Sequence, residues 1–239
     1  MSDAVIQHAA LPHYDARWYP ADTYTRSAGP YTSHYPVALL DGSTLELPLR
    51  TLPSGDGAIA LLMSNQTPFE VEDALAPLIA QVASTFSPDC VAAVPTMGLD
   101  YARLTARKLG LPHYVAMGLS RKFWYDDGLS ERMNSSTSPD HFKKLYLDPA
   151  LLKRLEGTRV VLVDDVINTG TSAVAAIRLL ERAGANVVGL AVALTEGYAW
   201  RDALAELGPC WPHKVRAAGH IPVFTKAEGG GWTPVPATL

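Results

Sequence analysis

The chain has 239 residues, of which 48% are hydrophobic and 18% are charged, and its basic and acidic residues leave a formal net charge of −4. This balance excludes disorder for most of the chain and argues against non-specific binding to nucleic acid or to an anionic membrane. No apolar run reaches the roughly 18 residues of a membrane-spanning helix, and the first residues lack the pattern of an export signal. Cys90 and Cys210 have no metal-ligand spacing, which predicts two buried thiols in a reducing cytoplasm.

The N-terminal part combines an aromatic stretch with predicted strands. In residues 1–36, proline and polar residues interrupt six Tyr and Trp side chains, so no helical or strand period survives. This pattern indicates an arm packed over the domain or against a second subunit. Residues 37–50 predict a hairpin, because two apolar runs flank Asp41-Gly42, a dipeptide that supplies the positive φ of a tight turn. Residues 58–63 are a further strand candidate.

From residue 67 the pattern changes to alternating helices and strands. Thr67 and Glu70 have the spacing of a capping box ahead of an apolar helical face over residues 71–86. Short apolar strands are predicted at residues 90–94, 114–117, 159–163 and 186–194. Helical patterns ending near Leu109 and Ala183 separate them. Strands that alternate with helices predict an α/β fold whose parallel sheet has helices on both faces and a ligand crevice at the carboxyl ends of its strands.

This pattern divides the chain into three units. Residues 1–66 form the arm and hairpin, residues 67–194 form the α/β core, and residues 195–239 form a C-terminal segment rich in Gly, Pro and Trp. Within the core, residues 118–146 are polar and aperiodic, and they are far longer than an ordinary connection.

The most informative motif is VVLVDDVINTGTS, residues 160–172. A buried parallel strand delivers two adjacent carboxylates, Asp164 and Asp165, to the crevice. The turn that follows offers backbone N–H groups, hydroxyls and the positive end of a helix, all of which suit a phosphate. Carboxylates beside a phosphate cradle fit a ligand that also carries hydroxyls or a divalent ion, such as a sugar phosphate. The alternative is an acidic strand end followed by an ordinary Asn/Thr/Gly turn.

This motif resembles the fingerprint of the type I phosphoribosyltransferases: four apolar residues, two acids, two apolar residues, any residue, then Thr-Gly and small or hydroxyl residues. The resemblance covers about residues 69–194. It implies a parallel-sheet core with helices on both faces and a small hood built from the N-terminal and C-terminal segments. It also implies binding of 5-phospho-α-D-ribosyl 1-diphosphate (PRPP) together with Mg²⁺.

The resemblance assigns roles to the residues of the motif. Asp164 and Asp165 would hold the ribose 2- and 3-hydroxyls and steady Mg²⁺ through its waters, with no direct protein ligand to the metal. Val166 would lie under the base. The 5-phosphate would be held by Asn168, Thr169, Gly170, Thr171 and Ser172.

Two further family elements have counterparts. The loop that grips the diphosphate corresponds to Thr96, Met97 and Gly98, where Gly98 would let the backbone approach the ligand and Met97 replaces a common basic residue. Residues 118–146 correspond to a mobile lid. Arg121 and Lys122 match the placement of an Arg-Lys pair in adenine phosphoribosyltransferases, and they are the expected catalytic cations. For Lys143 and Lys144 a solvated loop is the favoured interpretation.

The sequence indicates less clearly which base would be the substrate. Asn168 and Glu196 stand where enzymes for 6-oxopurines have an Asp and a Lys, which argues against hypoxanthine and guanine. Residues 145–148 lack the Glu of adenine enzymes. Residues 164–172 also look like the orotate enzymes, whose dense Lys-containing lid is not obvious here. Phe224 is the expected stacking residue, followed by Trp232 and Tyr35, with a core or interface aromatic as the alternative for each.

The resulting hypothesis is a cytoplasmic, Mg²⁺-dependent, homodimeric enzyme that moves a phosphoribosyl group between PRPP and a nitrogenous base, without nucleic-acid or membrane partners. A PRPP-sensing regulator of the same fold is the alternative, but such proteins usually add a DNA-binding helical module or a basic RNA-binding face. A diphosphokinase would need a longer chain with a duplicated domain.

Overall fold

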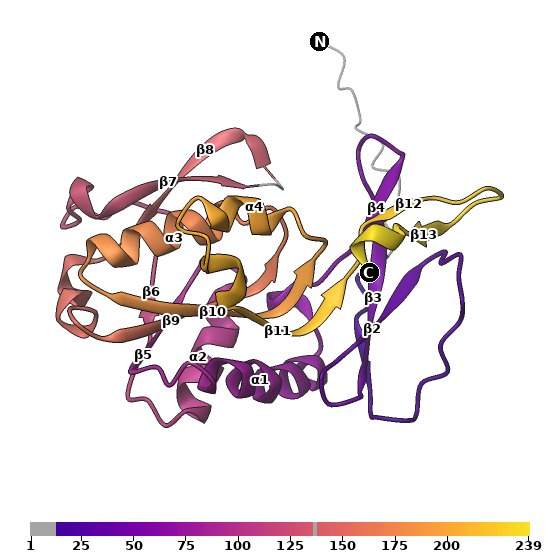
Figure 1. The fold of residues 1–239 in the computed structure, drawn as a ribbon, viewed down its shortest axis with the longest axis horizontal. Coiled ribbons are helices and arrows are strands. Elements are labelled where there is room, and N and C mark those ends of the chain that lie inside the picture. The colour runs from indigo at the N-terminus through magenta and orange to yellow at the C-terminus, as the bar shows by residue number, and fades with distance from the viewer. Residues whose placement is uncertain (1–12, 136–137) are drawn as a thin grey trace, which may run out of the picture.

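The computed structural model describes residues 13–135 and 138–239, and it is organised around a five-stranded parallel sheet (Figure 1). The strand order is β11-β10-β9-β5-β6. In that order the strands are Val215–Ile221, Asn186–Glu196, Arg159–Ile167, Cys90–Ala93 and Val115–Ala116. The predicted α/β fold with a parallel sheet is therefore confirmed.

Helices cover both faces of this sheet, and the alternation along β9 explains why. Val161 and Val163 pack into the same hydrophobic cluster as residues of α1 (Phe69–Ser84) and α2 (Gly98–Lys108). Val160 and Leu162 pack on the other side with residues of α3 (Thr171–Arg182) and α4 (Trp200–Ala205). Because successive side chains of a strand point to opposite faces, β9 is buried on both faces of the sheet.

The start of α1 differs from the expected capping box. Pro68 occupies the N-cap and none of the described side chains caps the helix. The Thr67 hydroxyl instead donates to the Ser64 carbonyl at 3.0 Å, within the turn of the short 3₁₀ helix Ser64–Gln66. Because the Thr67 hydroxyl is hydrogen-bonded within the preceding turn, it does not cap α1, and the predicted capping box is wrong.

The parallel sheet continues past residue 194, where the expected core ended. The boundary falls inside β10, and β11 adds a parallel edge strand after α4 and the 3₁₀ helix Trp211–Lys214. The sequence of β11, VRAAGHI, mixes small, basic and apolar residues. Its strand conformation therefore depends on pairing with β10 and not on a strong local pattern.

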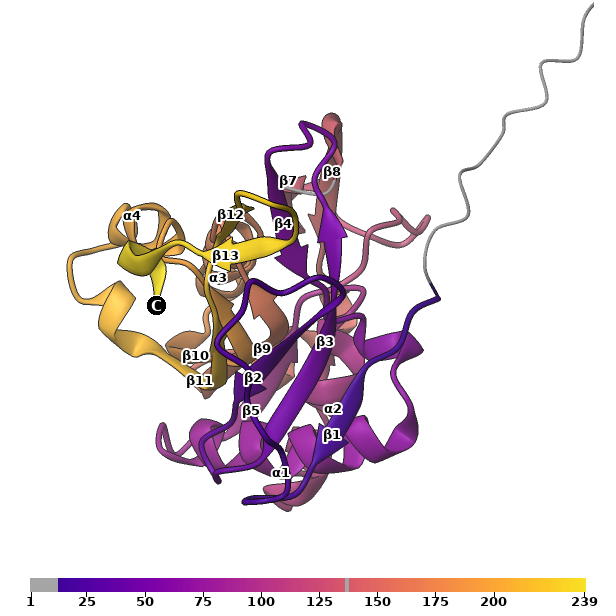
Figure 2. The same ribbon diagram turned by 90° about the vertical axis from the view of Figure 1, so that its right-hand side faces the viewer.

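A second, antiparallel sheet joins the two ends of the chain (Figure 2). Its strands are β1 (Arg17–Tyr19), β2 (His34–Ala38), β3 (Thr44–Thr51), β4 (Gly57–Ala60), β12 (Phe224–Lys226) and β13 (Trp232–Pro234). The expected hairpin is present as β2–β3, with Gly42 at φ +86° in its loop. Strand β12 pairs with β4, so N-terminal and C-terminal segments together form the expected hood.

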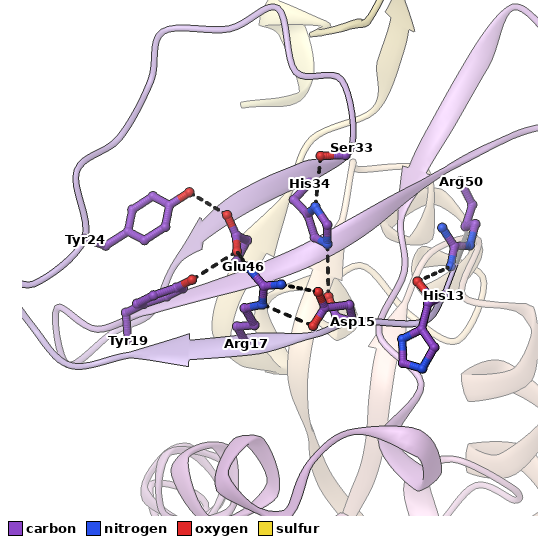
Figure 3. A network of polar contacts seen from close by, with 9 residues as sticks. All are labelled: His13, Asp15, Arg17, Tyr19, Tyr24, Ser33, His34, Glu46 and Arg50. Atoms are coloured by element: carbon purple, nitrogen blue, oxygen red, sulfur yellow. Dashed lines mark hydrogen bonds and ion pairs between the residues drawn. The ribbon is translucent and has the colours of Figure 1, made fainter. Parts of the chain in front are cut away.

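The described part of the aromatic arm is held on the hood sheet by a polar network around Glu46 of β3 (Figure 3). The Tyr24 hydroxyl donates to one Glu46 carboxylate oxygen at 2.8 Å, and the Tyr19 hydroxyl donates to the other at 3.2 Å. Arg17 pairs with Asp15. From residue 13 onward the arm therefore packs over its own domain, which was one of the two predicted arrangements.

The segment 118–146 is more ordered than its aperiodic sequence indicates. Strands β7 (Ser130–Ser135) and β8 (Ser138–Tyr146) form an antiparallel hairpin. Arg182 of α3 fastens it by pairing with Glu131 and by donating to the Ser130 carbonyl at 2.9 Å. The expectation of an irregular loop is corrected, because paired polar strands leave little hydrophobic alternation in the sequence.

Two expectations about composition are also tested. None of the helices in the described part of the chain has the length and apolar character needed to cross a bilayer. Cys90 is buried, as predicted, but Cys210 is exposed. Cys210 lies just before the short helix at residue 211, on the surface of the β10–β11 connection.

Candidate functional site

A cleft of about 480 Å³ opens at the carboxyl ends of β5 and β9, beside the end of β10. The core contributes residues 94–97 and 164–170 to its lining, together with Ser172, Ala173 and Glu196. The hood side contributes residues 59–63, and the β7–β8 hairpin contributes Met133 and Lys143. The cleft thus lies where a parallel sheet is expected to bind its ligand.

Asp164 and Asp165 lie side by side at the end of β9 and line the cleft. The backbone N–H of Asp165 donates to Oδ1 of Asp164 at 3.0 Å. Burial raises the pKa of both carboxyls, and the neighbouring Asp165 raises that of Asp164 further. Because two buried like charges repel, the pair favours a proton, a cation or a hydroxyl-bearing ligand that neutralises or hydrogen-bonds it.

The turn after the acid pair leads into the N-terminus of α3, which is suited to an anion. Asn168, Thr169, Gly170 and Ser172 line the cleft, as expected for this motif. Gly170 adopts φ +80° at the N-cap, and none of the described side chains caps the helix there. The first amides of a helix have no intrahelical acceptor, so this end presents N–H groups and a positive dipole to the cleft.

One member of the turn has a different placement. Thr171 does not line the cleft, and its hydroxyl lies 3.2 Å from that of Thr169. Thr171 is the exposed first residue of α3, and its hydroxyl is placed to hydrogen-bond that of Thr169.

The loop after β5 reaches the cleft through Thr96 and Met97. The Ser64 hydroxyl donates to the Met97 carbonyl at 2.7 Å and holds this loop. Gly98 begins α2 and does not line the cleft. A Cβ at Gly98 would lie 2.8 Å from Oδ1 of Asp164 and 2.9 Å from the Val163 carbonyl. Close contact between α2 and β9 therefore requires a glycine here, and the approach of this backbone to a ligand stays a prediction from the sequence.

The cations of the expected lid are arranged differently from the sequence interpretation. Arg121 is paired with Asp127 at 2.8 Å, and neither Arg121 nor Lys122 lines the cleft. Lys143 of β8 does line it, opposite Met133 in the hairpin register. Among the described residues, Lys143 is the only basic side chain in the lining.

A signal for Lys143 was present in the sequence. Lys143 alternates with Leu145 and Leu147, both fully buried. Because side chains of a strand alternate with a period of two, this pattern places Lys143 on the inward face of the strand. The signal is missed when the segment is interpreted as an irregular loop.

Glu196 ends β10 and lines the same cleft beyond the acid pair. Its residue is 9% exposed, and its carboxyl has no hydrogen-bond or ion-pair partner among the residues that the structure describes. Burial raises its pKa to about 7. The neighbouring Thr195 is held differently, because its hydroxyl lies 2.8 Å from Nδ1 of His220, whose Nε2 lies 2.6 Å from the Thr238 carbonyl.

The aromatic residues expected to stack on a base do not line the cleft. Phe224 is 2% exposed and its ring centroid lies 4.9 Å from that of Tyr35, inside the hood core. Trp232 is half-buried on β13, where its backbone pairs with Tyr31. Val166 does reach the cleft, and the hood side of the lining is the aliphatic segment 59–63, which sequence reasoning missed.

The site contains no protein cage for a metal within the described residues, where no group of three or more His, Cys, Asp or Glu side chains converges. The acid pair is nevertheless suited to a hydrated divalent ion, because buried carboxylates need a positive partner. An ion bound here would be held through waters and through oxygens of the ligand.

Comparisons with known proteins agree with this geometry. Residues 68–206 match the model of the phosphoribosyl transferase domain. An orotate phosphoribosyltransferase of Staphylococcus epidermidis is 30% identical over 159 residues, which cover 66% of this chain and 61% of that protein. One from Staphylococcus aureus is 28% identical over 179 residues, which cover 74% and 66%. The alignments thus span less than two thirds of these relatives.

Solved structures show the same fold. The adenine phosphoribosyltransferase of Rhodothermus marinus aligns with a TM-score of 0.51 at 24% identity and covers 64% of this chain and 80% of its own. That of Thermoanaerobacter pseudethanolicus aligns with a TM-score of 0.51 at 21% identity and covers 64% and 84%. Because the matched domain model spans more than half of the chain and includes the acid pair and the turn 168–172, this chain belongs to the phosphoribosyl transferase domain family.

Proposed function

We propose that this protein is an Mg²⁺-dependent phosphoribosyltransferase that moves the 5-phosphoribosyl group between PRPP and a small nitrogenous base. The observation that carries the proposal is the position of the half-buried pair Asp164–Asp165 directly before the turn 168–172, in one cleft. A ribose 5-phosphate carries both kinds of group that this cleft suits, hydroxyls for the acid pair and a phosphate for the turn. A homodimer and a cytoplasmic location stay predictions from the sequence.

Different residues of the cleft bind different parts of PRPP. Asp164 and Asp165 would accept hydrogen bonds from the ribose 2- and 3-hydroxyls and would hold Mg²⁺ through its waters. The 5-phosphate takes its hydrogen bonds from the turn 168–172 at the start of α3. Thr96 and Met97 meet the diphosphate through the loop after β5, and Lys143 supplies a positive charge from the hairpin. Arg121 and Lys122 do not line the cleft, so the segment 118–146 would have to rearrange before these two side chains reach the diphosphate.

The reaction breaks the bond between ribose C1 and the diphosphate oxygen and forms a bond between C1 and a ring nitrogen of the base. Bond breaking leads, so positive charge develops on the sugar and negative charge on the diphosphate. Mg²⁺, when held near Asp164 and Asp165 through waters and ligand oxygens, would supply positive charge that offsets the charge on the diphosphate. The chain itself contributes positioning, exclusion of water and fixed charges, which are the main sources of catalysis in such transfers.

The test is the double variant Asp164→Asn with Asp165→Asn. We expect it to fold, because neutral amides relieve the repulsion between two buried charges, and to lose Mg²⁺-dependent PRPP binding measured by calorimetry. Asp202→Asn, on the exposed surface of α4, is the matched control and leaves binding unchanged.

Diphosphate release with a panel of bases completes the test. Unchanged PRPP affinity in the double variant contradicts the assignment of the site. PRPP binding without diphosphate release for any base identifies a sensor in place of an enzyme.

A further inference from the structure

The charges that line the cleft are unequally distributed. Asp164, Asp165 and Glu196 contribute three carboxyls, and Lys143 is the only cation among the described lining residues. The proposed function gives Asp164 and Asp165 to the sugar and the hydrated metal, and Lys143 to the diphosphate. Glu196 is left without a role in holding PRPP.

Glu196 is also left without a protein partner. Its carboxyl has no hydrogen bond or ion pair within the described part of the chain, although the residue is 91% buried. The carboxyl oxygens of Glu196 are not among the described side-chain atoms that are both buried and unpartnered, so they keep access to the cleft, where a ligand can hydrogen-bond them. The carboxyl lies in the cleft wall, and Thr195, bonded to His220, holds the end of β10 in place.

The strand register places Glu196 beside the acid pair and the turn that follows it. Strands β9 and β10 are parallel neighbours, with Val166 opposite Leu194 and Ile167 opposite Thr195. Glu196 therefore lies one residue beyond the strand positions that flank the turn 168–172. If the phosphate of a ligand occupies that turn and its ribose meets the acid pair, Val166 and Glu196 are neighbouring lining residues left to contact its third part, the base.

We propose that Glu196 selects the base, and that the acceptor is a neutral nitrogen heterocycle with an exocyclic amine and not an anionic ring such as orotate. This inference rests on the proposed function. An exocyclic amine donates to a carboxyl oxygen whether or not the carboxyl is ionised. An exocyclic oxygen can be satisfied only by the protonated form. An anionic ring would place a further negative charge in a buried wall that already holds three carboxyls.

The protonation state supports this selectivity. Burial raises the pKa of Glu196 to about 7. At pH 8 the carboxyl is mostly ionised and accepts hydrogen bonds only. The other charged groups of the lining are Asp164, Asp165 and Lys143, and the proposed ligand engages all three through its sugar and diphosphate.

The experiment measures binding of mononucleotides at pH 8 by calorimetry, so that it does not depend on turnover. Two pairs differ at the amine position: AMP against IMP, and CMP against UMP. Orotidine 5′-monophosphate is the anionic probe, and ribose 5-phosphate reports the sugar-phosphate site alone. We expect at least a tenfold preference for the amine in one of the pairs, and at least tenfold weaker binding of orotidine 5′-monophosphate than of that preferred nucleotide.

The variant Glu196→Gln keeps the size of the side chain but removes its charge. We expect it to reduce the amine preference to about threefold or less while ribose 5-phosphate binds within twofold of the wild type, which also shows that the variant folds. Glu228→Gln, in the exposed loop between β12 and β13, should match the wild type.

The two proposals fail in different ways. If ribose 5-phosphate and PRPP do not bind, the proposed function fails. If they bind but orotidine 5′-monophosphate is preferred, or neither pair favours the amine, or Glu196→Gln keeps the wild-type preference, the inference about Glu196 is overturned and the proposed function stands.

Discussion

Gly98 and Asp164 are in contact across the junction of α2 and β9: a Cβ atom added to Gly98 would lie 2.8 Å from Oδ1 of Asp164. The absence of a side chain at the start of one helix thus sets the position of a carboxylate on the neighbouring strand. The loop before the helix and the acid pair are therefore coupled, although about 65 residues separate them in the chain.

Gly98→Ala should disturb the acid pair. The added methyl group must displace Asp164 or the backbone of β9, which we expect to lower the free energy of unfolding by about 1–3 kcal/mol. The Kd for PRPP should rise at the same time, as measured by calorimetry. Gly118→Ala is the control, because its Cβ would lie 3.9 Å from the nearest atom. An unaltered PRPP affinity in Gly98→Ala would show that the acid pair does not depend on this contact.

Lys143→Ala should lower kcat on the order of 100-fold, because the variant loses a positive charge that stabilises the leaving diphosphate. Lys144→Ala is the matched control, since Lys144 is the exposed neighbour on the same strand. Steady-state kinetics with PRPP and the preferred base provide the measurement. If the double variant Arg121→Ala with Lys122→Ala has the larger effect on kcat instead, the segment 118–146 moves during turnover and brings those two cations to the diphosphate.

Glu196→Gln should change how stability depends on pH. The folded-state pKa of Glu196 is raised to about 7 from its ordinary value of 4.5. The folded state therefore binds the proton more tightly than the unfolded state, and the wild type loses stability as the pH rises from about 4.5 to 7. The shift corresponds to about 3 kcal/mol. Denaturant unfolding across this range should show a smaller decline in the variant, and parallel curves would contradict the raised pKa.

Phe224→Ala should affect the fold and not base selection. The ring is buried against Tyr35 in the hood core, so its removal should lower the free energy of unfolding by about 3–5 kcal/mol. The ratio of AMP to IMP affinity, or of CMP to UMP affinity, should stay as in the wild type under conditions where the variant is folded. A changed ratio at equal sugar-phosphate affinity would restore the stacking role that the sequence indicated.

Some features could be predicted because their signals are local. The β2–β3 hairpin follows from Asp41-Gly42, and Gly42 has the positive φ of such a loop. The strand, acid pair, turn and helix of residues 159–182 follow from one continuous pattern, and the structure has them in that order. Other elements were missed because long-range pairing creates them: β11 needs β10, and the strands of the β7–β8 hairpin need each other.

The amino-acid sequence by itself determined the α/β core, its crevice and the motif of acid pair and turn, because a buried strand followed by a turn and a helix is specified by neighbouring residues. Only the tertiary structure decided which other side chains meet that motif. Lys143, Glu196 and residues 59–63 come to the cleft from separate strands, whereas Phe224 is taken into the hood core. The reason is physical: the face on which a side chain is buried depends on what packs against its strand, and that partner lies far away in the chain.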